Sequence, residues 1–313
     1  MKLAMMFPGQ GSQSVGMLAE LAQQDRVITD TFAESSAVLG YDLWELVQQG
    51  PAERLSETEH QQPAMLTADI ATWRYWLKAG GFQPEVVCGH SLGEFAALVA
   101  ANALPFTDAV TLVRERAQRM QAAVPAGIGA IAAVLGLDDD AIAAACKEAA
   151  QGEVVEPVNF NSPGQAVIAG HARAVQRALE ACKSRGAKRA LLLPMSVPAH
   201  SSLMQPASEQ FGKALAVARF QQPALAFWSP VDCQRHDDPV GLRQLLVRQL
   251  ISPVRWTDLI RTLVAAGANT FVECGPGKVL TGLNRRIDKS AHIQCLALQD
   301  SASVRAALHP HSQ

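Results

Sequence analysis

One stretch of the sequence, residues 86–95 (Val-Val-Cys-Gly-His-Ser-Leu-Gly-Glu-Phe), constrains the fold more than any other. An apolar run ends at Cys88, a Gly-x-Ser-x-Gly turn follows, and an alanine- and leucine-rich helical pattern starts at once. In this order of strand, turn and helix, Gly-x-Ser-x-Gly forms a nucleophile elbow that exposes the serine hydroxyl above the sheet. The helix would direct its free N–H groups and positive dipole end toward the turn. The pattern therefore predicts a nucleophilic Ser91; an ordinary glycine-flanked turn is the alternative.

The length and charge of the chain exclude several classes of protein. With 313 residues, of which 49% are hydrophobic, the chain can bury one large core or two unequal ones. Its 27 basic and 29 acidic residues give no electrostatic support for a nucleic-acid partner. The apolar run at the N-terminus is too short for a signal sequence and no stretch approaches the length of a membrane span, so we expect a cytoplasmic protein with no membrane partner. Six scattered cysteines have no metal-ligand spacing, which predicts reduced thiols and no metal site.

The first 124 residues indicate an α/β arrangement around the elbow. Residues 3–7 read as a buried strand, followed by the loop Pro-Gly-Gln-Gly-Ser-Gln at 8–13. Helical patterns follow at 16–39, from the residue after Pro63 to Lys78, and at 106–122. The first loop lacks the spacing of a phosphate-binding motif, but it could place the backbone N–H of Gln10 beside the elbow. Together with the N–H of Leu92 it would form an oxyanion hole; taken alone, it is more often a tight turn.

The pattern of expected strands and helices changes at residue 125, and residues 125–195 predict a small inserted domain. Their pattern alternates strand, helix, strand, strand, helix and strand, which is the order of the ferredoxin-like split unit. Residues 1–124 and 196–313 would then form one large catalytic domain, with a substrate cleft between the two. Near the C-terminus, helices are expected at 240–250 and 256–266, and a structural glycine turn at 275–278. The tail after Ser301 is expected to be frayed.

Two further residues are candidates for chemistry. His200 follows an approach held extended by Pro194 and Pro198, so it would be placed rigidly at the entry to a helix. This distinguishes His200 from the other seven histidines, although a lone loop histidine usually lies on the surface. Arg116 lies in a helical pattern with other arginines, and such arginines usually form a solvated face.

Taken together, these motifs resemble one family: the malonyl-CoA:acyl-carrier-protein transacylases of bacterial fatty-acid synthesis. The resemblance covers nearly the whole chain. Its motifs are residues 8–13, 89–94 (Gly-His-Ser-Leu-Gly-Glu), Arg116, 158–165 (Val-Asn-Phe-Asn-Ser-Pro-Gly-Gln), 198–201 (Pro-Ala-His-Ser), 247–250 (Val-Arg-Gln-Leu) and 275–278 (Gly-Pro-Gly-Lys).

The resemblance implies an α/β-hydrolase-like core with an inserted ferredoxin-like subdomain. It implies that Ser91 becomes malonylated and that His200 is the general base and acid. The backbone N–H groups of Gln10 and Leu92 would form the oxyanion hole. Arg116 would bind the malonyl carboxylate. Gln249 would lie in the site and help place Ser91 and His200, with a nearby backbone carbonyl orienting the histidine.

The implied substrates are malonyl-CoA and an acidic, phosphopantetheinylated acyl carrier protein, with no cofactor and a monomeric enzyme. The same chemistry could serve a malonate decarboxylase or a polyketide carrier protein. Two rival functions also remain: a serine thioesterase or hydrolase, in which the elbow releases acyl groups to water, and a non-enzymatic scaffold that docks a carrier protein. An intact serine and histidine argue against the scaffold.

Overall fold

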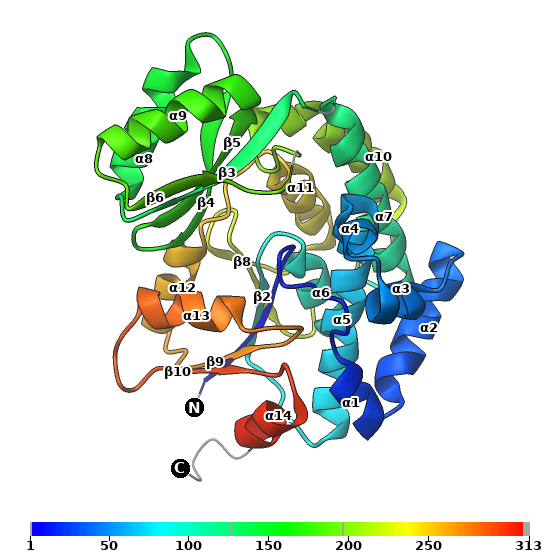
Figure 1. Cartoon of the computed structure of the whole chain (residues 1–313). Helices are drawn as coiled ribbons and strands as arrows, with labels where there is room; N and C mark the ends of the chain where they lie inside the picture. Colours follow the sequence, from blue (N-terminus) through cyan, green and yellow to red (C-terminus); the bar gives the residue numbers. More distant parts are fainter. Residues whose placement is uncertain (1, 126, 196, 309–313) are drawn as a thin grey trace.

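The computed structural model describes residues 2–125, 127–195 and 197–308. They form a mixed α/β structure with two sheets, as the sequence predicts (Figure 1). The larger sheet has the strand order β10-β9-β1-β2-β7-β8. Its strands are β1 (Leu3–Phe7), β2 (Val86–Gly89), β7 (Ala226–Ser229), β8 (Gln234–His236), β9 (Thr270–Glu273) and β10 (Gln294–Ala297). All neighbouring strands are parallel except β8, which runs antiparallel to β7.

The larger sheet is buried on both faces, as the alternating directions of the β1 side chains show. Met5 and Phe7 pack into one core, whereas Ala4 and Met6 pack into another on the opposite face. Successive side chains of a strand point to opposite faces, so a strand covered on both sides must be apolar throughout. Every residue of β1 is buried, which explains its continuous apolar sequence.

Helices cover each face of this sheet. In Figure 1, α12 and α13 lie on one side of it, and α5, α6, α7 and α10 lie on the other. The helices of this part are α1 (Ala19–Gln24), α2 (Val27–Leu39), α3 (Leu43–Gln49), α4 (Ala52–Ser56), α5 (Thr58–Lys78), α6 (Gly93–Ala100), α7 (Phe106–Ala123), the 3-10 turn η1 (Ser202–Met204), α10 (Gln205–Val217), α11 (Pro239–Gln249), α12 (Trp256–Ala265), α13 (Val279–Ile287) and α14 (Ser301–Leu308).

The smaller sheet is antiparallel in all three pairings and has the order β4-β5-β3-β6. Its elements follow one another as β3 (Gly129–Leu135), α8 (Asp139–Ala150), β4 (Val155–Ser162), β5 (Gln165–His171), α9 (Ala172–Ser184) and β6 (Arg189–Leu192). Helices α8 and α9 lie on the outer face of this sheet (Figure 1) and share a core with it. The opposite face carries Ile131 and Val167, packed with Leu193 and Met195.

The two sheets are joined through β4. Phe160 N–H donates to the Val254 carbonyl at 2.9 Å, and Val254 N–H donates to the Val158 carbonyl at 2.9 Å. The Thr257 hydroxyl, in the first turn of α12, donates to the Phe160 carbonyl at 3.1 Å. These bonds hold one edge of the smaller sheet against the larger unit.

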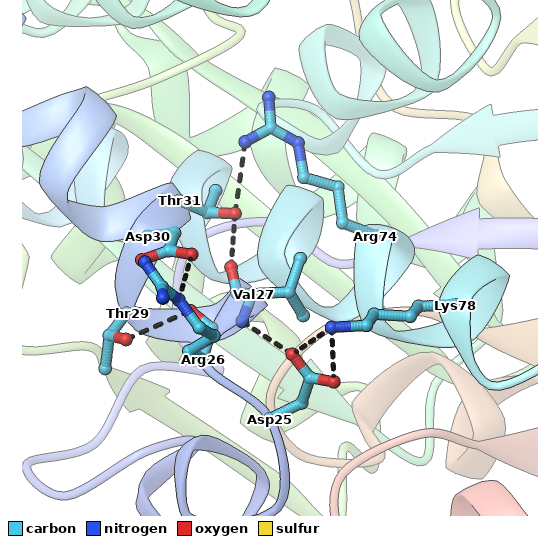
Figure 2. A network of polar contacts seen from close by, with 8 residues as sticks. All are labelled: Asp25, Arg26, Val27, Thr29, Asp30, Thr31, Arg74 and Lys78. Atoms are coloured by element: carbon cyan, nitrogen blue, oxygen red, sulfur yellow. Dashed lines mark hydrogen bonds and ion pairs between the residues drawn. The ribbon is translucent and has the colours of Figure 1, made fainter.

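The expected single helix over residues 16–39 is wrong, because the chain breaks between α1 and α2. Asp25 adopts an extended backbone, and its carboxylate accepts from the Val27 N–H at 2.9 Å. The same carboxylate pairs with Lys78 at the end of α5, as Figure 2 shows. An acidic side chain that accepts from the first turn of a helix marks a helix start rather than a helix interior. Farther along α2, Arg74 from α5 donates to the Thr31 hydroxyl at 3.1 Å, which fixes α2 on α5 (Figure 2).

Two other expectations are corrected. Helix α5 begins at Thr58 rather than after Pro63, because the N–H groups of His60 and Gln61 both donate to the Glu57 carbonyl and close a turn before the proline. The tail after Ser301 is not frayed through residue 308. It forms α14, which is held by hydrogen bonds from Ser301 to Glu20 and buries Val304. Residues 309–313 lie outside the described residues.

The state of the cysteines and the character of the helices complete the description of the fold. All six cysteines are buried and free. Within the described ranges, no helix combines the length and the apolar character needed to cross a membrane.

Candidate active site

The elbow has the predicted order of strand, turn and helix. β2 ends at Gly89 and α6 begins at Gly93, and between them Ser91 has a φ of 53°, in the left-handed region. A Cβ at Gly89 would lie 2.0 Å from the carbonyl carbon of Gly93, and one at Gly93 would lie 2.1 Å from the Phe7 oxygen. No side chain fits at either position. The two glycines therefore let the strand and the helix approach closely enough to hold Ser91 in its strained conformation.

His200 lies directly against the serine. Its Nε2 is 2.7 Å from the Ser91 Oγ, and its Nδ1 is 2.8 Å from the Gln249 carbonyl oxygen. Because a carbonyl only accepts, Nδ1 carries the proton and Nε2 is left to accept from the serine hydroxyl. His200 itself has a φ of 67°, so the turn that follows the two prolines aims the ring at the elbow. The pair is arranged for proton transfer from Ser91 to His200.

The imidazole is neutral in this setting. The His200 side chain is buried, and burial, followed by the charge of Arg116, lowers its pKa to about 3. An imidazole that stays unprotonated near neutral pH has its Nε2 lone pair available as a base. The group behind the histidine is a backbone carbonyl rather than a carboxylate, so the pair carries no net charge.

Arg116 is fully buried beside the same serine. Its Nη1 donates to Gln62 Oε1 at 2.8 Å, and its Nη2 donates to Gln249 Oε1 at 3.1 Å and to Ser91 Oγ at 3.2 Å. Within the described residues no carboxylate lies within 4.0 Å of the guanidinium. Burial lowers the pKa of Arg116 to about 10, which leaves it charged at neutral pH. The usual solvated position of a helix arginine, the alternative for Arg116, is therefore excluded for this residue, whereas Arg119 is exposed.

Two backbone N–H groups near the serine have no hydrogen-bond acceptor among the described residues: that of Leu92 in the elbow and that of Gln10 in the loop packed on it. Within residues 2–125, 127–195 and 197–308, neither the Gln10 N–H nor the Leu92 N–H donates a hydrogen bond. The loop that carries Gln10 packs on the elbow so closely that a Cβ at Gly9 would lie 2.5 Å from the His90 oxygen. The Gln10 side chain turns away and donates to Thr58 Oγ1 at 3.1 Å. Both N–H groups are therefore available to a ligand, as the predicted oxyanion hole requires.

A cleft opens in front of Ser91 and His200 between the two sheets. It is lined by Pro8, Gly9, Gln10, Ser12, His90, Ser91, Ile131, Asn159, Asn161, Gln165, Val167, Leu193, Met195, Ala199, His200, Val279, Leu280 and Leu283. Across this cleft, His90 Nε2 lies 2.8 Å from Asn161 Oδ1, so the elbow is bonded to β4 of the smaller sheet. Three of the six predicted residues, Gln10, Ser91 and His200, line the cleft. The other three, Leu92, Arg116 and Gln249, are buried and do not line it.

Comparison with known proteins agrees with this geometry. Residues 5–303 match the family model described as acyl transferase domain. The malonyl CoA-acyl carrier protein transacylase of Salmonella typhimurium is 53% identical over 98% of this chain and 99% of its own. That of Escherichia coli is 52% identical with the same coverage. The chain belongs to this transacylase family.

Solved structures of family members superpose closely on the chain. The transacylase from Coxiella burnetii has a TM-score of 0.97 and 46% identity, covering 100% of this chain and 98% of its own. A malonyl-transacylase solved in complex with a type II PKS acyl-carrier protein has a TM-score of 0.97 and 49% identity, covering 99% of this chain and all of its own.

Three polar residues of the site were not predicted from sequence. Gln62 bonds to Arg116, Asn161 bonds to His90, and Glu94 accepts a hydrogen bond from the Gln249 side chain. Gln62 was missed because the helix was expected to start after it. Glu94 and Asn161 stand inside recognised motifs, but nothing in their spacing shows which partner each would meet. Helix and strand positions alone do not reveal contacts over such sequence separations.

Proposed function

We propose that the protein transfers a malonyl group from coenzyme A to the phosphopantetheine thiol of an acyl carrier protein, through a malonyl ester on Ser91. The observation that carries the proposal is a neutral Ser91–His200 pair within hydrogen-bond distance of the buried Arg116 guanidinium, which has no carboxylate partner among the described residues. A nucleophile next to a free cation suits an acyl group that bears its own carboxylate.

In the first half-reaction, His200 Nε2 takes the hydroxyl proton as Ser91 Oγ attacks the thioester carbonyl. The carbonyl oxygen becomes an oxyanion, which the N–H groups of Gln10 and Leu92 stabilise. The carbon–sulfur bond then breaks, and the departing coenzyme A sulfur takes the proton from His200. In the second half-reaction the carrier thiol gives its proton to His200, attacks the malonyl ester and displaces Ser91 Oγ, which recovers the proton.

Arg116 would hold the malonyl carboxylate during both halves. Its guanidinium is already oriented by Gln62 and Gln249, and its Nε is buried without a hydrogen bond among the described residues. A planar guanidinium can bind a carboxylate with two parallel hydrogen bonds, which an ammonium cannot do. The site would therefore favour malonyl over acetyl groups.

We further propose that the larger sheet is an α/β-hydrolase-like core, formed by residues 1–124 and 196–313, and that 125–195 form an inserted ferredoxin-like subdomain. The parallel sheet with an elbow after β2 supports the first assignment. The antiparallel order β4-β5-β3-β6 with two helices on one face supports the second. Residue 196, where the large domain would resume, lies outside the described residues. A monomeric state and a cytoplasmic location stay predictions.

A polyketide carrier protein is a second candidate acceptor. The observation in its favour is the solved relative in complex with a type II PKS acyl-carrier protein, which is 49% identical to this chain. The enzyme chemistry would be the same with either carrier.

A two-stage transfer assay tests the proposal. The enzyme is loaded with malonyl-CoA, freed of coenzyme A by gel filtration, and then mixed with a holo acyl carrier protein of fatty-acid or polyketide type. We expect malonyl to move to the carrier in the second stage, with parallel double-reciprocal plots at steady state. Release of free malonate in place of transfer would identify a hydrolase and overturn the proposal.

A further inference from the structure

Glu94 is a fully buried acid next to the site, to which the mechanism above assigns no role. It lies in the first turn of α6, three residues after the nucleophile. We propose that Glu94 is a positioning residue for malonyl transfer: through the Gln249 amide, its carboxylate holds the guanidinium of Arg116 in the orientation that receives malonyl. This inference rests on the proposed function.

The contacts form one continuous chain from Glu94 to the guanidinium. Gln249 Nε2 donates to Glu94 Oε2 and also to the Ser91 carbonyl oxygen at 2.9 Å. The other end of the amide, Oε1, accepts from Arg116 Nη2 at 3.1 Å. Each of the three side chains is at most 1% exposed, so no solvent competes with these bonds.

The direction of the amide follows from donor and acceptor chemistry. An ionised carboxylate only accepts hydrogen bonds and a guanidinium only donates them, whereas a glutamine amide does each at opposite ends. Glu94 therefore forces the NH₂ of Gln249 toward itself and the oxygen toward Arg116. With the amide reversed, its NH₂ would face the guanidinium, two donors would oppose each other, and the Ser91 carbonyl would lose its partner.

The charge of Glu94 stabilises the charged form of Arg116, but its carboxylate does not take up the hydrogen-bond donors of the guanidinium. Glu94 is the group whose charge raises the pKa of Arg116 against the effect of burial. Because the Gln249 amide stands between them, the two charges are not directly paired, and the guanidinium keeps donors for a substrate carboxylate. A simpler role for Glu94 is stabilisation of the N-terminus of α6, which the test must separate from positioning.

The first test replaces Glu94 by glutamine, which keeps the volume but removes the acceptor-only character. We expect kcat/KM for malonyl-CoA to fall roughly 10- to 100-fold, the usual weight of a hydrogen bond to a charged group, and kcat/KM for acetyl-CoA to fall much less. The matched control is Ser35→Ala, which removes a buried hydrogen bond of 2.7 Å between α2 and Thr67 of α5, neither residue being hydrogen-bonded to a residue of the site within the described part of the chain. The control should lower the melting temperature and leave the malonyl-to-acetyl ratio unchanged.

A charge exchange separates positioning from stability. The double variant Glu94→Gln, Gln249→Glu keeps both groups and one buried charge, but it puts the carboxylate against Arg116. We expect the malonyl-to-acetyl ratio to stay low, because the guanidinium is now occupied, and the melting temperature to recover only in part, because the carboxylate at 249 cannot donate to the Ser91 carbonyl. Recovery of both quantities would show a merely structural pair and overturn the proposal, as would an unchanged ratio in Glu94→Gln.

The unaltered enzyme provides a measurement that does not depend on a variant folding. Burial raises the pKa of Glu94 to about 7, against the hydrogen bond from Gln249, the nearby Ser229 hydroxyl and the charge of Arg116, and Oε1 of Glu94 is buried with no hydrogen-bond partner among the described residues. The other ionisable groups that act on Glu94 or are affected by it are Asp232, which follows β7, and Cys88 on β2. Below its pKa, Glu94 is protonated, gains a donor and no longer fixes the amide.

We therefore expect the malonyl-to-acetyl ratio to fall several-fold as the pH drops through about 7, with no such step in Glu94→Gln. A ratio that stays flat over this range would contradict the proposal. An enzyme that transfers malonyl normally but shows none of these effects refutes only the role of Glu94, whereas an enzyme that transfers no malonyl refutes the proposed function.

Discussion

Two parts of the same site are built in opposite ways. Ser91 and His200 form an uncharged pair whose geometry comes from the backbone: both residues have positive φ, and a backbone carbonyl orients the histidine. Arg116, 3.2 Å from the same serine, is charged and is held by side-chain amides from two different helices.

This difference suggests that the reaction and the choice of substrate depend on different residues of the site. A nucleophile held by the turn and a base held by a carbonyl would serve any acyl thioester, because the proposed mechanism gives neither of them a contact with the group that distinguishes one acyl chain from another. The guanidinium would serve only an acyl group with a carboxylate. Substitutions in the first part should therefore affect malonyl and acetyl substrates alike, whereas those in the second should affect malonyl alone.

The largest effect is expected in the uncharged part. His200→Ala removes the base that accepts the Ser91 proton, and loss of a general base costs roughly 10²–10⁴-fold in rate. We expect this loss for malonyl-CoA and acetyl-CoA to a similar extent, measured as kcat for coenzyme A release. A loss confined to malonyl-CoA would contradict this division of the site, since it would mean that His200 selects the malonyl group rather than supporting the reaction of both substrates.

A smaller and selective effect is expected for Arg116→Ala. Removing one partner of a buried charge pair costs about 2–5 kcal/mol, or roughly 30-fold to several thousand-fold in kcat/KM for malonyl-CoA. Acetyl-CoA brings no carboxylate, so its kcat/KM should hold or rise. Arg116→Lys should recover only part of the malonyl activity, because an ammonium cannot make the forked contact. An unchanged malonyl-to-acetyl ratio in Arg116→Ala would mean that the carboxylate binds elsewhere.

The smallest effect is expected for Gln62→Leu, which removes the acceptor of the 2.8 Å bond from Arg116 Nη1. The guanidinium stays in place through Gln249 but loses one of its two amide supports. We expect kcat/KM for malonyl-CoA to fall about tenfold, in line with one lost hydrogen bond to a charged group, with acetyl-CoA unaffected. An equal fall for both substrates in the same kinetic assay would show that Gln62 also supports the serine.

Sequence predicted the uncharged part better than the charged part, for a physical reason. The elbow is local: an apolar run, two glycines and a helical pattern within ten residues suffice to place Ser91. The surroundings of Arg116 depend on α5, α7 and α11 packing together, which a periodic pattern does not show. The same limit explains why the contacts of Glu94 and Asn161 were not predicted. The break between α1 and α2 is different, because it depends on a local hydrogen bond from the Val27 N–H to the Asp25 carboxylate.

The central claim is that malonyl is carried on Ser91, and intact-mass measurement tests it most directly. After mixing with malonyl-CoA, the enzyme should gain the mass of one malonyl group, and peptide mapping should place it on Ser91. Ser91→Ala should gain nothing, and Arg116→Ala should load malonyl slowly but at the same serine. An adduct on another residue, or unmodified enzyme that still transfers malonyl to the carrier, would contradict the account.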